Sequence, residues 1–385
     1  MKKVGVLFNR ENLLPFILAA FLFVGTTGIV SSHYIGAFML LVILTTHPNK
    51  IHYSTPFQIV FIIIILSFLN EIIHLFFVGA PSSFIELIPY SLFILLTMWA
   101  ARIVDEKVLR WMLWFTLIDI GSAIVQRIIG VNTFLPESMS DVAEMGGDLL
   151  YDLKVNGLNT NPSGLGYKAF LALLIYERFP QCRFCGKYLW YFICLLGIIL
   201  AFNRTMLIAS VAYFGIKLLK SKNRVLIIPL VVLLLFYVLS DPDTAEFIVT
   251  QITRGGGSLS EGNAMSGREE VYAHYIQFCK DHFFLGNGSF KYYLGEGLHA
   301  HNSFLQTMAT NGIVITTLYI IMLLSTIRKQ NYIYIIPFLV SAMTQSFILW
   351  GASYNDFIMY CLMLKPVGEV AFLRTDKTRE YINKC

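Results

Sequence analysis

The stretch HAHNSFLQTMATNG, residues 299–312, places two histidines and an asparagine directly before a long apolar run. An imidazole with an ordinary pKa of about 6.5 can act as a general base or bind a metal ion at neutral pH. A metal site would need further ligands. His274 and His282 show no diagnostic spacing to His299 and His301, so we expect no metal ion here. The pair is a candidate for a catalytic base, or for polar residues at a membrane edge.

Cations beside apolar segments form the second group of candidate residues. A charged side chain in such a position is costly, and by default it is functional or paired. Arg204 begins an apolar segment, Lys168 follows NPSGLGY, and Arg127 ends an apolar run. Together with Arg268, these cations could hold a phosphate group, because paired N–H donors bind phosphate oxygens strongly. The alternative for each is a contact with lipid headgroups or with solvent.

The composition indicates the environment of these residues. The chain has 385 residues, of which 56% are hydrophobic and 14% charged, and its mean hydropathy is +0.65. Soluble proteins carry about 25% charged residues, so this chain has too little polar surface to face water. Apolar segments of about 20 residues recur along it, which predicts an all-α polytopic membrane protein with about 12 transmembrane helices. The predicted spans are 13–30, 33–46, 57–79, 84–101, 108–130, 162–177, 187–202, 205–219, 225–240, 302–325, 332–349 and 355–364.

The distribution of positive charge tests this topology independently. With the N-terminus in the cytoplasm, most of the 29 Lys and Arg residues fall in cytoplasmic segments. The alternation predicts that both termini are cytoplasmic. The net charge of +5 therefore follows from topology and does not indicate nucleic-acid binding. Arg127, Lys168, Arg204 and Arg268 belong to the minority that falls on the outer side or within a span.

Two predicted outer loops, 131–161 and 241–301, are much longer than the other connections within a single integral membrane domain, 1–385. Loops of this length are usually functional or disordered. The first is acidic. The second contains SGREEVYAHYIQFCKDHFFLGNG, residues 266–288, which carries a helix signal. We expect this partly helical second loop to carry part of an active site.

The sequence of the second loop predicts where its helix begins, which residues share one face and where it ends. Ser266 and Glu269 form a capping box that predicts a helix from Gly267. Gly286 and Gly288 end the element. Arg268 falls in the first turn, where free backbone N–H groups favour an anion. The predicted apolar face consists of Val271, Tyr275, Phe278 and His282.

Polar residues inside the predicted spans have two explanations. Asn70, Glu71 and His74 lie in the third span, and Asp119 lies in the middle of the fifth. They could form a proton relay in a transporter, or they could pair internally with tyrosines or arginines. A lone CxxC at Cys182 has no second pair that would complete a zinc site.

The second half of the chain, roughly residues 157–325, resembles the O-antigen ligase and polymerase superfamily, polytopic enzymes of bacterial surface-polysaccharide assembly. The most specific motif is H-[NSQ], nine residues and then G, which His301, Asn302 and Gly312 match in spacing. Ile315 stands where the family often has Gly, Thr or Tyr. The segments NRT, SGR with FFLGNG, and NTNPSGLG resemble further family motifs in the same order.

The resemblance implies a donor glycan on undecaprenyl pyrophosphate at the periplasmic face of the bacterial inner membrane. It also implies displacement at the anomeric carbon, with development of positive charge on the sugar ring. Arg204 and Arg268 would hold the pyrophosphate, while His301 would remove or position the acceptor proton. Asn302 would orient the histidine or a sugar hydroxyl. His299, Lys168 and Arg127 are further substrate-binding candidates.

The sequence is compatible with three functions. The leading hypothesis is a metal-independent polymerase, without a cofactor, that joins lipid-linked repeat units. The first alternative is a ligase that transfers the glycan to lipid A-core, and the second is a polysaccharide-lipid transporter. Membrane lipid is an expected partner, a chain-length regulator protein is a candidate partner, and no nucleic acid is expected.

Overall fold

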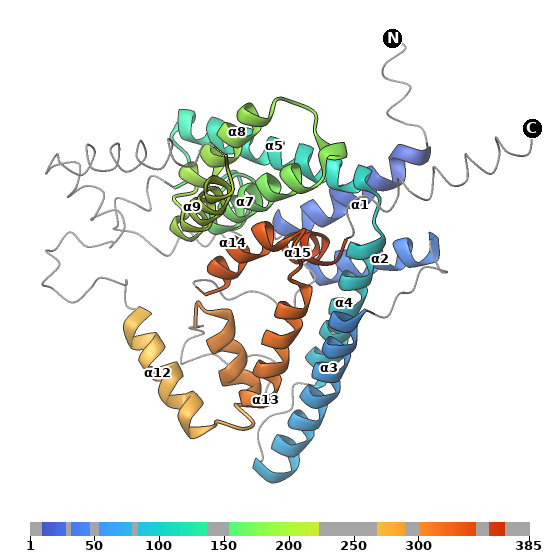
Figure 1. The fold of residues 1–385 in the computed structure, drawn as a ribbon, viewed down its shortest axis with the longest axis vertical. Coiled ribbons are helices and arrows are strands. Elements are labelled where there is room, and N and C mark those ends of the chain that lie inside the picture. The colour runs from blue at the N-terminus through green and yellow to red at the C-terminus, as the bar shows by residue number, and fades with distance from the viewer. Residues whose placement is uncertain are drawn as a thin grey trace, which may run out of the picture. The chain divides into compact units, whose positions relative to one another are not determined.

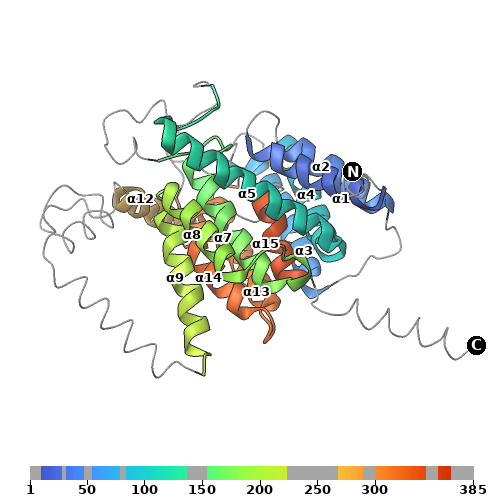
Figure 2. The ribbon, with the colours of Figure 1, turned by 90° about the horizontal axis from the view of Figure 1, so that it is seen from above.

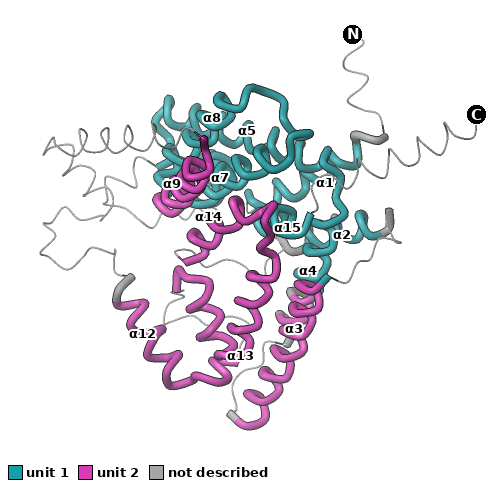
Figure 3. The backbone as a smooth tube through the Cα atoms, in the orientation of Figure 1, with its two compact units in different colours: residues 1–54, 92–203, 350–385 teal, residues 55–91, 204–349 magenta. Residues whose placement is uncertain are grey.

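The computed structural model describes residues 10–27, 32–46, 54–78, 84–136, 154–222, 268–288, 300–343 and 354–365. Two compact units emerge, and they are interleaved along the chain (Figure 3). Unit 1 comprises Met1–Ser54, Leu92–Asn203 and Trp350–Cys385, and unit 2 comprises Thr55–Ser91 and Arg204–Leu349. The described residues are helical and contain no strand, as the apolar pattern predicts.

The helices are labelled in Figure 1. Unit 1 contains α1 (Arg10–Val24), α2 (Ser32–Thr46), α5 (Glu106–Ile129), α7 (Pro162–Arg178), α8 (Lys187–Leu200) and α15 (Tyr354–Leu364). Unit 2 contains α3 (Thr55–Ile73) with a π-helical end, η2 (His74–Val78), and α9 (Arg204–Leu219), α12 (Arg268–Asp281), α13 (Ser303–Thr326) and α14 (Tyr332–Ala342). The helix α4 (Phe84–Ile103) is divided between the units.

Each predicted span overlaps a helix where it is described. Span 225–240, residues 28–30 of the first span and residues 344–349 of span 332–349 lie outside the described residues. By length and hydropathy alone, three described segments are long enough to cross a membrane, namely Thr55–Phe77, Glu106–Ile129 and Ser303–Thr326, and the last of these is bent at Gly312. Several other apolar helices, such as Lys187–Leu200, are shorter. A helical membrane protein is therefore supported, while the number of twelve spans stays a prediction.

Unit 1 is built around α7. All side chains from Leu165 to Tyr176 are buried, as expected for a helix that is apolar on every side. The helices α5, α8 and α15 pack against it, and α1 packs along α5. Figure 2 shows α5, α7 and α8 side by side. The entry to α7 has a clear local cause, because Asn161 caps the helix by accepting the Gly164 N–H at 2.9 Å and Pro162 occupies the first turn.

Unit 2 pairs α3 with α13, α9 with α14, and α12 with α13. The helix α13 is not straight, because Gly312 has φ 74° and ψ −174°. The chain folds back there, so Phe304 contacts Tyr319 with ring centroids 5.9 Å apart. A straight helix would separate these two residues by about 22 Å. The single span predicted at 302–325 therefore consists of two arms that meet at Gly312. Figure 1 shows α13 as two helical arms joined at a bend.

Candidate functional site

The first arm of α13 begins at the predicted His301–Asn302 pair. The Asn302 side-chain oxygen accepts the N–H groups of Phe304 and Leu305, both at 3.0 Å. This is the capping interaction that satisfies free N–H groups at a helix start. The Asn302 amide nitrogen donates to the Met343 carbonyl oxygen at 3.0 Å, which ties the helix start to the end of α14. Asn302 thus fixes both the position and the direction of this arm.

His301 holds an uncommon backbone conformation directly before this cap. Its φ is 47°, in the left-handed region that few non-glycine residues adopt. Such a conformation costs of order 1–3 kcal/mol and concentrates at functional sites. The side chain is partly buried. Tyr272 of α12 donates a long hydrogen bond of 3.5 Å to the His301 carbonyl oxygen. Two neighbours, Tyr272 and the Asn302 cap, therefore hold His301 in place.

The helix α12 packs on the first arm through a small apolar core. Tyr275 and Cys279 of α12 pack with Ala300 and Ala309, and Val271, Phe278, Leu305 and Met308 surround them. Burial raises the pKa of the Cys279 thiol to about 11, so the thiol stays neutral. The predicted face of Val271, Tyr275 and Phe278 is confirmed. His282 does not belong to it, because it follows the last residue of α12 and is exposed.

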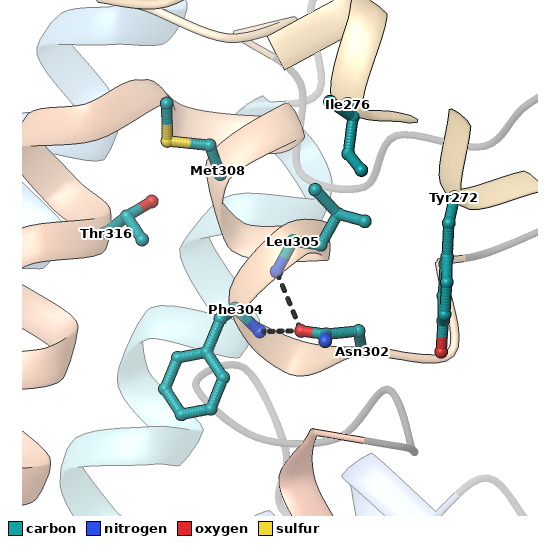
Figure 4. Close-up of a pocket in the computed structure, with 7 residues that line it drawn as sticks. All are labelled: Tyr272, Ile276, Asn302, Phe304, Leu305, Met308 and Thr316. Carbon is teal, nitrogen blue, oxygen red and sulfur yellow. Dashed lines mark hydrogen bonds between the residues drawn. The ribbon is translucent and has the colours of Figure 1, made fainter. Parts of the chain in front are cut away.

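An open pocket of about 420 Å³ lies where α12 meets the first arm. Figure 4 shows Tyr272 and Ile276 projecting from α12 on one side and Asn302 and Leu305 on the other. The remaining lining residues are Phe304, Met308 and Thr316. The pocket is mainly apolar, with polar groups only from Tyr272, Asn302 and Thr316, and His301 adjoins its Asn302 end. Such a concave site with few polar groups is typical of ligand pockets.

The segment that follows α12, residues 283–288, is called the glycine turn below. It packs on the bend of α13, where backbone groups of Ala309, Thr310 and Ile313 cannot form the hydrogen bonds of a regular helix. Backbone groups of the glycine turn take the place of the missing helical partners. The bonds join Ile313 N to Phe283 O at 2.9 Å, Asn287 N to Ala309 O at 2.8 Å, and Gly288 N to Thr310 O at 3.0 Å. The glycine turn and Gly312 thus form one structural unit that stabilises the far end of the arm.

The predicted phosphate-binding arginines lie in unit 2. Arg204 is the first residue of α9 and is partly exposed. Arg268 is the first residue of α12, one residue after the predicted start. The side chain of Arg268 and the whole of His299 lie outside the described residues, as do Ser266 and Gly267 of the predicted cap. Arg204, Arg268 and His301 therefore all stand at or just before the first residue of a helix.

The other two cations, Lys168 and Arg127, belong to unit 1. Arg127 is exposed in the last turn of α5. Lys168 is fully buried, and its Nζ atom lies 2.7 Å from the carboxylate of Asp119. The rings of Phe23 and Tyr354 lie 4.4 and 5.6 Å from the same nitrogen. This pairing gives Lys168 a structural role, and its predicted contact with substrate stays a prediction.

The Asp119 carboxylate organises the segment before α7 as well. It accepts the Leu158 N–H at 2.7 Å and the Asn159 side-chain amide at 3.0 Å. Gly157, with φ 61°, lies so close that a Cβ atom would overlap the carboxylate. Internal pairing of Asp119 was one of the two expected explanations, although the partner is a lysine and not a tyrosine or arginine. The last part of the predicted loop 131–161 is thus packed into unit 1.

Comparison with protein families gives one match. Residues 189–320 match the family described as O-antigen ligase. Over these residues the chain is similar to the O-antigen ligase family. The match supports the superfamily of O-antigen polymerases and ligases, whose members are glycosyltransferase-like enzymes. No curated protein matches the chain.

The matched residues include all of α9 and α12 and most of α8 and α13. Arg204, Arg268 and the His301–Asn302 pair all lie inside the matched residues, whereas Arg127 and Lys168 precede them. The matched residues also contain the pocket, of whose lining residues the sequence analysis predicted Asn302 but missed the others, Tyr272 and Ile276 among them. Tyr272 and Ile276 are four residues apart and share a face of α12 beside the predicted one. That spacing indicates a second face of α12, but nothing in the sequence shows which segment packs near this face.

Proposed function

We propose that the protein is an O-antigen polymerase that joins repeat units carried on undecaprenyl pyrophosphate, at the periplasmic face of the bacterial inner membrane. The similarity to the O-antigen ligase family supports the class of enzyme and the membrane setting. The observation that carries the proposal is the position of His301, strained and held next to an open pocket within the matched residues. Both chain termini would be cytoplasmic.

The proposed reaction is a substitution at the anomeric carbon of the donor sugar. An acceptor hydroxyl oxygen forms the new glycosidic bond while the bond from the anomeric carbon to the pyrophosphate oxygen breaks. His301 takes the hydroxyl proton, and undecaprenyl pyrophosphate leaves with its negative charge. Arg204 and Arg268 stabilise that charge. Asn302 orients His301 or a sugar hydroxyl, and His299, Lys168 and Arg127 remain predicted contacts for the substrate.

The direct test is glycan transfer by the purified protein in vesicles that contain lipid-linked repeat units. His301→Asn and His301→Ala should lower the rate of transfer by about 10²–10⁴-fold, the usual contribution of a general base. Asparagine tolerates the left-handed backbone at this position, so the first variant removes the base without strain. His274→Ala, at an exposed histidine of α12, is the matched control and should transfer at the wild-type rate.

Transfer at the wild-type rate by both His301 variants would refute the proposed role of His301. No transfer by the wild-type protein, with repeat units crossing the vesicle membrane instead, would favour the transporter.

A ligase is the second candidate, because the matched family is described by that activity. Both functions use the same donor, so the acceptor separates them. Deletion of the gene should reduce the lipopolysaccharide ladder to core plus one repeat unit if the protein is a polymerase. Core without any repeat unit would instead indicate a ligase, which the vesicle assay with lipid A-core as acceptor would confirm.

A further inference from the structure

The glycine turn lies beside the end of a helix that is long enough to cross a membrane. The Asn70 amide donates to the Leu285 carbonyl oxygen at 2.7 Å, and the Nε2 atom of His74 lies 3.3 Å from the Gly286 carbonyl oxygen. Asn70 and His74 are both buried. Gly288 lies so close to the His74 ring that a Cβ atom would overlap it. The turn is thus tied to one short section of α3.

The position of that section along α3 gives the depth of the glycine turn. Thr55–Phe77 is the most apolar of the candidate spans, with a mean hydropathy of 2.5. At about 1.5 Å per residue, Asn70 and His74 lie about 22 and 28 Å from Thr55 along the helix axis. The hydrocarbon layer is about 30 Å thick. If α3 crosses the membrane from Thr55, the residues that bind the turn lie within this layer.

The side chains of the turn suit this depth. Phe283, Phe284 and Leu285 have exposed fractions of 45, 71 and 38%. The exposed side chains of α12 are largely polar up to Asp281, so the surface changes from polar to apolar where the turn begins. Phe76 and Phe77, at the end of α3, are exposed to 76 and 83%. They continue a stripe of exposed apolar residues along α3 that includes Phe61, Ile65, Leu69 and Ile72.

The backbone of the turn suits this depth as well. Irregular backbone is tolerated in the hydrocarbon layer only where its polar groups find partners within the protein. The N–H groups of Gly286, Asn287 and Gly288 donate to protein carbonyl groups. The carbonyl group of Phe283 accepts from the bend of α13 and that of Leu285 from Asn70 of α3, and the Gly286 carbonyl oxygen lies 3.3 Å from Nε2 of His74. These backbone groups thus bond inward while the large apolar side chains of the turn are exposed.

We propose that the glycine turn, residues 283–288, is a re-entrant element of the membrane, with Phe283, Phe284 and Leu285 in contact with lipid chains. It belongs to a segment that topology alone assigns to the outer loop 241–301. This inference goes beyond the proposed function, since lipid contact requires no glycan transfer. It places the end of α12 and the bend of α13 within the lipid bilayer.

Photocrosslinking to lipid tests this proposal in the full-length protein. The photoreactive residue p-benzoylphenylalanine is introduced at Phe284, and the protein is irradiated in phosphatidylethanolamine and phosphatidylglycerol vesicles. Phe61 on the apolar stripe of α3 is the positive control, and Gln277 on the exposed face of α12 is the negative control. A parallel variant at Phe283 covers the case that the first does not fold.

Mass spectrometry of the labelled peptides gives the result. We expect phospholipid adducts at Phe284 with a yield similar to that at Phe61, and none at Gln277. Adducts at Phe61 without adducts at Phe284 or Phe283 would overturn the proposal, as would crosslinks from the turn to protein alone. The readout does not involve glycans, so it is independent of whether the protein proves to be a polymerase.

Discussion

Replacing Asp119 by leucine should destabilise unit 1 more than replacing Asp119 and Lys168 together. The Asp119 carboxylate accepts from Lys168 Nζ at 2.7 Å, from Leu158 N at 2.7 Å and from the Asn159 amide at 3.0 Å. Both side chains of the ion pair have no exposed surface. Removing the carboxylate alone leaves an uncompensated buried ammonium group. Breaking a buried pair in this way costs about 3–5 kcal/mol of the free energy of unfolding.

The double variant Asp119→Leu with Lys168→Met removes both charges. The Leu158 N–H loses its acceptor in the single and in the double variant, and the Asn159 amide keeps only its bond to the Asn156 carbonyl oxygen. An orphaned buried donor costs about 1–3 kcal/mol. The second substitution should therefore restore about 3–5 kcal/mol of stability to the single variant, because the charge penalty disappears. The double variant should still be less stable than the wild-type protein.

Thermal unfolding of the purified proteins in one detergent measures this order. We expect the midpoint to fall from wild type to the double variant and further to Asp119→Leu, with Lys168→Met completing the mutant cycle. A double variant no more stable than Asp119→Leu would refute the reasoning, because it would show that the charge of Lys168 is not the source of the loss.

Two further substitutions test the arm of α13 at its two ends by the same unfolding assay. Asn302→Ala should lower the free energy of unfolding by about 0.5–2 kcal/mol, because two capping hydrogen bonds are lost. Asn302→Ser keeps a capping side chain and should lose less. Equal losses of stability in the two variants would contradict the capping role. Gly312→Ala should lower the free energy of unfolding by at least about 1–3 kcal/mol, because only glycine readily adopts this backbone conformation. A Cβ atom at this position would also overlap the Phe284 carbonyl group. Unchanged stability would show that the bend is not required.

Local patterns predicted the helical elements well. The apolar runs placed the helices, and the Asn-Pro sequence marked the start of α7, where Asn161 indeed forms the cap. The spacing of Val271, Tyr275 and Phe278 predicted the buried face of α12. These features depend on residues within one or two helical turns of each other. A sequence shows such relations directly, since helix periodicity and caps are local properties.

Partners distant in the sequence were not predictable in the same way. Lys168 looked like a phosphate ligand because a lone cation in an apolar helix has no visible partner in its own segment. Its partner, Asp119, lies on α5, and only the packing of α5 against α7 brings them together. Likewise, the sequence predicts only that Gly286 and Gly288 end a helix. Their positive φ values of 63° and 68° and their close approach to α3 and α13 give them a second role in packing.

The spacing between the His301–Asn302 pair and Gly312 now has a geometric explanation. The first arm, from Ser303 to Asn311, is held at one end by the Asn302 cap and at the other by the glycine turn. Each residue added to or removed from a helix rotates one end against the other by about 100° and shifts it by about 1.5 Å. A changed spacing would turn Asn302 away from Met343, and His301 away from Tyr272, while the bend stayed in place. The spacing between the His301–Asn302 pair and Gly312 therefore corresponds to a fixed length of helix between the Asn302 cap and the bend.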